Sequence, residues 1–295
     1  MCITEPEHEF VWNWAGKTIQ IGFERRGAGP IVLMLPALSS ISTLSEMRPL
    51  QKRLASLFTT VSVDWPGFGD RPKPRVDWRP EAYSAFLNHL VTRVTPSPFA
   101  TVAAGHAAGY VLVQAATVPG SVGRLCLVAP TWRGPLPTMM GKRIAASMWI
   151  VRAVDHPLLG PPFYRLNVNR FIVRMMGRGH VYADPNWLSG ARLAEKLAVT
   201  RAAGARHASV RFVAGELDPV RSRADLLALA ARIANPILVL YGAGTPPKSK
   251  AEMHALATLP NTRATILTSG KLGVHEEFPD AVAEVIKSFL TEGSG

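Results

Sequence analysis

Residues 105–109 read GHAAG, which is the spacing of a catalytic turn with a nucleophile between two glycines. An apolar stretch (99–104) precedes them, and an apolar helical pattern (110–116) follows. This is the strand–turn–helix context that such a turn requires. Its small residues let the strand and the helix approach closely. The middle residue is Ala107, however, and a methyl group is not a nucleophile.

The flanking sequence predicts the elements that position this turn. Alternating apolar residues at 10–14 and 18–23 predict an antiparallel hairpin. Apolar or β-branched runs predict strands at 31–35, 59–65, 99–104, 124–128, 237–241 and 264–267. Helical patterns lie at 44–57, 80–94, 110–116, 222–233, 249–256 and 279–290.

The alternation of strands and helices stops after Ala129-Pro130 and resumes near residue 222. We therefore expect an α/β fold with a mostly parallel, eight-stranded sheet and an inserted helical lid. The expected parts are an N-terminal core (1–133), the lid (134–220) and a C-terminal core (221–295). Ligands bind such sheets beyond the carboxyl ends of the strands, so the lid would cover that crevice.

The chain is strongly basic, with a formal net charge of +12. Much of the excess lies between residues 142 and 178, where bulky apolar residues separate the cations. One interpretation is a set of helices with an apolar inner stripe and a solvated basic face. The alternative is a surface that contacts an anionic membrane. We expect no nucleic-acid partner, because no recognition motif accompanies the charge.

Targeting and cofactor signals are absent from the sequence. No apolar run is long enough to span a bilayer, and the acidic start lacks the pattern of a signal peptide. Cys2 and Cys126 do not make a disulfide framework, so we expect a cytoplasmic protein, peripheral to the inner membrane face if the lid contacts lipid. We expect no metal and no cofactor, because no Cys/His cluster or phosphate-binding glycine loop is present.

Residues 64–72 read DWPGFGDRP, and this segment resembles the D-x-P-G-F-G-x-S-x-x-P motif of the α/β-hydrolase superfamily. Residues 105–109 are similar to the G-H-S-x-G elbow of that superfamily, and residues 277–279 resemble the opening of its last helix. The resemblance extends over nearly the whole chain. It is to the lid-bearing branch of esterases, dehalogenases and epoxide hydrolases, and it implies their fold.

The resemblance also implies a triad of nucleophile, acid and histidine. The nucleophile position is Ala107, and the acid position after strand 237–241 is Thr245. The histidine position, seven residues before Pro279, is Leu272. We expect a lineage that has lost the triad, because a single engineered change would not account for three losses. The backbone amides of Leu38 and Ala108 would then form a polar cradle.

Other side chains are candidates for acid–base chemistry near the vacant triad. His275 lies at the start of the last helix, where the alternative is a capping or surface residue. Asp218 follows the lid, where the alternative is a cap on the next helix. His180 lies in the lid, where a helix–turn boundary explains it equally well. Further candidates are His106, Lys271, Glu216, Ser39, Ser40 and Ser42.

Three functions compete on this sequence. The first is a non-hydrolytic protein that binds an apolar small molecule or acts as an accessory to a protein partner. The second is an enzyme with non-triad acid–base chemistry, such as a lyase, an isomerase or a cofactor-free enzyme. The third is an accessory factor at an anionic membrane surface. The expected ligand-binding residues are Leu38, Ser39, Ala107, Ala108, Trp132 and Leu272.

Overall fold

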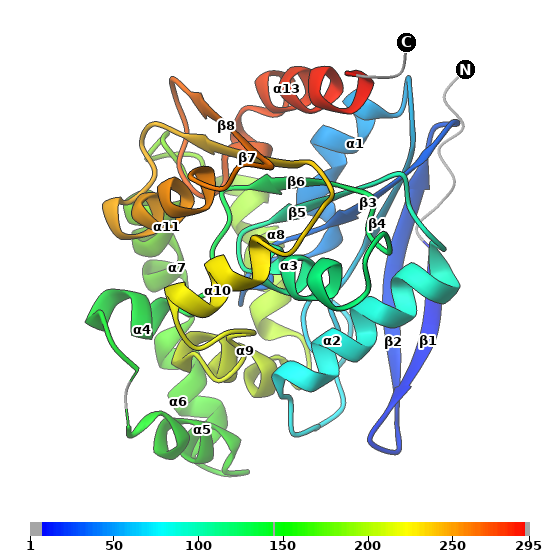
Figure 1. The fold of residues 1–295 in the computed structure, drawn as a ribbon. Coiled ribbons are helices and arrows are strands. Elements are labelled where there is room, and N and C mark those ends of the chain that lie inside the picture. The colour runs from blue at the N-terminus through cyan, green and yellow to red at the C-terminus, as the bar shows by residue number, and fades with distance from the viewer. Residues whose placement is uncertain (1–7, 144, 293–295) are drawn as a thin grey trace.

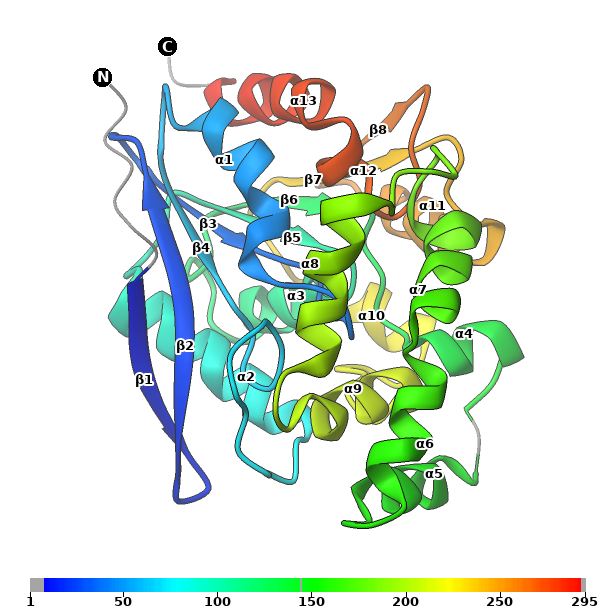
Figure 2. The same cartoon turned by 180° about the vertical axis from the view of Figure 1, so that it is seen from behind.

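The computed structural model describes residues 8–143 and 145–292 and joins eight strands into one sheet (Figures 1 and 2). The strands are β1 (His8–Trp14), β2 (Lys17–Arg26), β3 (Ile31–Leu35), β4 (Thr59–Val63), β5 (Ala100–Ala104), β6 (Arg124–Val128), β7 (Ile237–Gly242) and β8 (Thr262–Leu267). Their order is β1-β2-β4-β3-β5-β6-β7-β8. The pairs β1–β2 and β2–β4 are antiparallel, and every other pair is parallel. The predicted mostly parallel α/β sheet is therefore confirmed.

The apolar runs form strands because helices cover both faces of the sheet. Every residue of β4 and β5 is buried, and so is every residue of β7. The edge strand β8 is instead partly exposed along its whole length. Since the active crevice of such sheets lies at the carboxyl ends of the central strands, the ends of β3, β5 and β6 are where a site is expected.

Helices connect the strands and cover the sheet. Those of the core are η1 (Leu44–Met47), α1 (Arg48–Leu54), α2 (Pro80–His89), η2 (Leu90–Val94), α3 (Ala107–Thr117), α10 (Arg223–Ala230), α11 (Pro247–Ala257), α12 (Val274–Glu277) and α13 (Pro279–Thr291). Pro80 and Pro279 each open a helix, where the missing N–H leaves no hydrogen bond unmade. Within the described ranges, no helix combines the length and apolar character that crossing a membrane requires.

The segment between β6 and α10 is helical. It contains α4 (Pro135–Met140), α5 (Ser147–Asp155), α6 (Gly160–Asn167), α7 (Arg170–Met176), η3 (Gly177–Val181), α8 (Gly190–Arg201) and α9 (Ala205–Ala214). These helices contain two small apolar clusters separate from the main core, one around Val151 and one around Tyr182. The helical content agrees with the sequence pattern, while the domain limits of 134–220 and the role of a lid stay predictions.

Candidate functional site

The sharp turn after β5 is at Gly105. Strand β5 ends at Ala104 and α3 begins at Ala107, so two residues make the connection. Gly105 has a φ of 51°, a conformation that glycine adopts without steric cost. A Cβ atom at Gly105 would lie 3.2 Å from the Cβ of Ala37, in the loop after β3. The turn residue therefore faces the loop from which an oxyanion donor is expected.

This placement corrects the position that the sequence motif gave. Ala107 is the fully buried first residue of α3, and the described non-glycine residues with positive φ do not include it. The motif misleads because GHAAG contains two glycines, and the first of them takes the strained turn itself. Neither Gly105 nor Ala107 carries a group that attacks a carbonyl.

A carboxylate accepts a hydrogen bond from the backbone amide beside this turn. The amide of Ala37 donates a hydrogen bond to Glu46 Oε1, with a nitrogen–oxygen distance of 2.5 Å. Glu46 is buried in η1. Burial favours the neutral acid, but Lys196, His275 and the Ala37 amide together hold the pKa of Glu46 below its ordinary value. An anion bound at this amide would repel a second anion, so Ala37 is a poor oxyanion donor in this arrangement.

The motif at residues 64–72 helps to position Glu46. Asp64 accepts hydrogen bonds from the amide of Leu44 at 2.7 Å and from the hydroxyl of Thr43 at 3.0 Å. These bonds fix the start of η1, the helix that carries Glu46. Burial raises the pKa of Asp64 to about 7. The aspartate of this motif therefore has a structural role next to the site.

His275 faces Glu46 from α12. Its Nε2 atom lies 3.6 Å from Glu46 Oε1, slightly beyond hydrogen-bond distance. The side chain is buried, and neither ring nitrogen has a hydrogen-bond partner among the described residues. The alternative that His275 is a surface or capping residue is therefore wrong. A buried imidazole without a hydrogen-bond partner is uncommon in folded proteins, so this cluster is a candidate functional site.

A lysine from α8 completes the cluster. The Nζ atom of Lys196 lies 3.4 Å from Glu46 Oε2 and 2.9 Å from Glu276 Oε2. Burial disfavours its charge, but Glu276 and its neighbours raise the pKa of Lys196 well above its ordinary value. Tyr182 donates to the other oxygen of Glu276 at 2.7 Å. Glu46, His275 and Glu276 carry the kinds of ligand atom that bind a divalent ion. The Lys196 ammonium, however, lies between the two glutamate carboxylates.

The two other triad positions have different surroundings. The backbone amides of Leu272 and Gly273 donate to the carbonyls of His180 and Val181, at 3.4 and 2.8 Å. The segment after α7 therefore lies directly on the loop where a catalytic histidine would be. Thr245 is buried in the turn after β7, and its hydroxyl has no hydrogen-bond partner in the part of the chain that the structure describes.

His106, the residue after the turn glycine, lies close to Asp218. His106 Nε2 is 3.0 Å from the carbonyl oxygen of Leu217 and 3.8 Å from Asp218 Oδ1. Burial lowers the pKa of His106 to about 4 and raises that of Asp218 to about 7. Asp218 accepts from the amide of Gly134 at 2.7 Å, whereas Ser222 caps the following helix. The capping alternative for Asp218 is therefore wrong.

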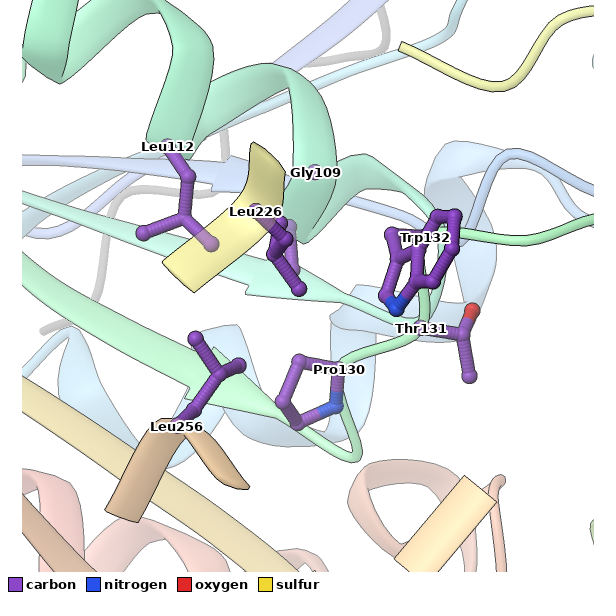
Figure 3. A pocket seen from close by; sticks show the side chains of 8 residues that line it. Gly109, Leu112, Pro130, Thr131, Trp132, Leu226 and Leu256 are labelled. Atoms are coloured by element: carbon purple, nitrogen blue, oxygen red, sulfur yellow. The ribbon is translucent and has the colours of Figure 1, made fainter. Parts of the chain in front are cut away.

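The pocket beside α3 is small and lined mostly by apolar residues. Figure 3 shows a small pocket beside that helix, whose lining is Ala108, Gly109, Leu112, Pro130, Thr131, Trp132, Leu226 and Leu256. It has no interior space for a water molecule. Ala108 and Trp132 are the predicted binding residues that line it, while Leu38 is buried in the core and Ser39 bonds to Ser42.

Comparison with known proteins identifies the class. Residues 32–285 match the model of the alpha/beta hydrolase family, and the chain belongs to that family. A search of curated proteins found no match.

Solved structures share the fold at low identity. Cfl2 from Burkholderia cenocepacia is 21% identical with a TM-score of 0.74, and the alignment covers 98% of this chain and 99% of that one. An esterase from Thermogutta terrifontis is 18% identical with a TM-score of 0.70, covering 98% and 99%. An enol-lactonase from Burkholderia xenovorans LB400 is 17% identical with a TM-score of 0.69, covering 93% and 97%. At these identities the likeness establishes the fold alone.

Proposed function

We propose that this chain is a non-hydrolytic member of the alpha/beta hydrolase family and works as a binding or accessory protein. The observation that carries the proposal is the turn after β5, where Gly105 has the positive φ and carries no side chain that could attack a carbonyl. The carboxylate of Glu46 on the Ala37 amide adds support, because its charge would repel a second anion at the adjacent Leu38 amide, an expected oxyanion donor. Proteins named esterase and enol-lactonase share the fold, but hydrolysis needs groups that this turn does not carry.

The proposal favours a protein accessory role over storage of a small molecule. The pocket beside α3 would have to open before it held an apolar ligand. We place the protein in the cytoplasm, an assignment that rests on the low cysteine content of the chain, which has only Cys2 and Cys126.

The experiment is an ester-hydrolysis assay on the purified protein, using p-nitrophenyl esters whose acyl chains have two to twelve carbons. An active serine esterase of the same fold is the positive control. We expect the rate of ester hydrolysis with the protein to equal the spontaneous rate in buffer alone. Turnover that copurifies with the protein through two columns and falls in a His275→Asn variant would contradict it.

A second function is favoured by one observation, the pairing of His275 with Glu46. A buried imidazole with two unbonded nitrogens, 3.6 Å from a carboxylate, is equipped to accept a proton from carbon. This would be acid–base chemistry without a covalent intermediate. Its test is incubation of apolar ketones and enol esters in D₂O with the protein, followed by NMR. Deuterium incorporation next to the carbonyl, lost in His275→Asn, would favour this function, and its absence across the panel would count against it.

A further inference from the structure

Helices α4 to α7 expose an unusual amount of apolar surface. They lie on the side of the molecule away from β1 and β2 (Figures 1 and 2). The described residues include fourteen exposed large apolar side chains, of which ten lie between residues 139 and 175. These ten, here called the 139–175 surface, are Met139, Met140, Met148, Trp149, Leu158, Leu159, Phe163, Leu166, Phe171 and Met175. A gathering of this kind usually marks an interaction site.

The exposed side chains follow helical spacing. Phe163 and Leu166 lie three residues apart on α6, and Phe171 and Met175 lie four apart on α7, so each pair shares one helix face. On α5, Trp149 is 70% exposed. The interpretation of an apolar inner stripe with a solvated basic face does not account for these exposed apolar side chains. These helices have an apolar inner face and a second apolar face toward solvent.

The charges of this segment have one sign toward solvent. Its cations are Lys142, Arg143, Arg152, Arg165, Arg170, Arg174 and Arg178. The acidic residue between positions 139 and 178 is Asp155. Asp155 is engaged internally, 2.6 Å from His207 Nδ1 and 2.7 Å from Arg211 Nη2 on α9. Arg143 is paired with Asp218 at 3.3 Å, and the segment has no other acidic residue to neutralise its remaining cations.

We propose that the 139–175 surface docks on an anionic lipid bilayer. Its apolar side chains would enter the boundary between headgroups and acyl chains, and its cations would meet the lipid phosphates. A second copy of the chain fits less well, because a twofold contact would bring the same cations together. Docking does not depend on whether the chain hydrolyses anything, so it stands apart from the proposed function.

The test is co-sedimentation of the full chain with vesicles of phosphatidylcholine alone, or with about one third phosphatidylglycerol. We expect at least tenfold stronger binding to the anionic vesicles. This preference should weaken between about 0.05 and 0.5 M salt, because salt screens the cations. Equal binding to both vesicles, or no binding at low salt, would overturn the proposal. Retention by an acidic protein without vesicle binding would also overturn it.

Matched variants separate the two contributions. The apolar variant is Leu158→Ser, Leu166→Ser and Phe171→Ser, and its control is Val11→Ser, Leu57→Ser and Ile266→Ser, also exposed. The charge variant is Arg165→Glu, Arg170→Glu and Arg178→Glu, and its control is Lys17→Glu, Lys52→Glu and Arg93→Glu, also exposed. We expect each surface variant to lose at least tenfold in binding and each control to stay within threefold. Controls that lose as much as the surface variants would refute a specific docking face.

A fluorescence measurement reports the contact directly. Trp149 belongs to the 139–175 surface, so its emission should shift to the blue when anionic vesicles are added. The difference between the protein and a Trp149→Phe variant isolates this signal from the other tryptophans. An identical shift in both proteins would contradict insertion of the surface.

Discussion

The amide nitrogen of Ala37 lies 2.5 Å from Glu46 Oε1, and the Cβ of Ala37 would lie 3.2 Å from a Cβ atom at Gly105. The turn that carries the nucleophile in hydrolases of this fold is thus next to a buried carboxylate. Glu46 is in turn bonded to Lys196 of the helical insertion. The loop after β3, from which an oxyanion donor is expected, therefore already binds a carboxylate.

The buried lysine should be a major contributor to stability. Lys196→Met removes the cation between Glu46 and Glu276 and leaves a buried and a partly buried carboxylate facing each other. We expect the free energy of unfolding to fall by about 3–5 kcal/mol. Urea unfolding measures it, with the exposed Lys52→Met as the matched control, which should stay within about 0.5 kcal/mol. A loss below about 1 kcal/mol would mean that the three charges do not act as a unit.

Replacing the turn glycine should cost more than replacing an open one. Gly105→Ala places a side chain at positive φ and 3.2 Å from the Ala37 Cβ. Gly120→Ala also has positive φ, but nothing lies within 4 Å of its Cβ. We expect about 1 kcal/mol of destabilisation for Gly120→Ala from the backbone alone, and a larger loss for Gly105→Ala. Equal thermal shifts for the two variants would disprove the close contact at the turn.

Asp218 should make stability fall as pH rises. Its folded pKa of about 7 lies above the ordinary value of 3.8 for this carboxyl group, so the folded state holds the proton more tightly. Its contribution is fully present below about pH 4 and is lost as pH rises through 7. In Asp218→Asn, the free energy of unfolding should therefore decline less between pH 4.5 and 7.5 than in the unmodified protein.

The Asp218→Asn variant and the unmodified protein both retain His106, whose effect on stability has the opposite pH dependence. His106 has a lowered folded pKa of about 4, so its own contribution is lost as pH falls from 6.5 toward 4. Because both proteins retain His106, the difference between their urea-unfolding profiles reports Asp218. Parallel profiles for the two proteins would show that the buried carboxyl is ionised throughout this range.

The sheet could be predicted from sequence because its strands are continuous apolar or β-branched runs. Residues 31–35 and 124–128 match β3 and β6 exactly as bounded in the structure. The sequence could not show that Gly105, not Ala107, makes the turn, because both residues are small and so are their neighbours at 103, 104, 108 and 109. The cluster of Glu46, Lys196 and His275 was equally hidden. Its members lie far apart in the chain, and only the packing of α8 and α12 against η1 joins them.

Adding a serine should not create a hydrolase. Ala107→Ser places a hydroxyl in a buried helix start, and Gly105→Ser places one at the turn with Leu272 at the histidine position. Without an activating base, both variants should show ester turnover within threefold of the unmodified protein. Efficient hydrolysis by Ala107→Ser would restore the elbow position that the motif gave.

In our proposal, no side chain of the protein acts as a nucleophile in acyl transfer. The most direct measurement is intact-protein mass spectrometry after incubation with a fluorophosphonate, which forms a covalent adduct with an activated serine. An active serine esterase of the same fold, treated in parallel, should gain one adduct. We predict that this protein keeps its unmodified mass at every time point. One adduct per chain, formed at a rate comparable to the esterase and located at a single hydroxyl, would contradict the account.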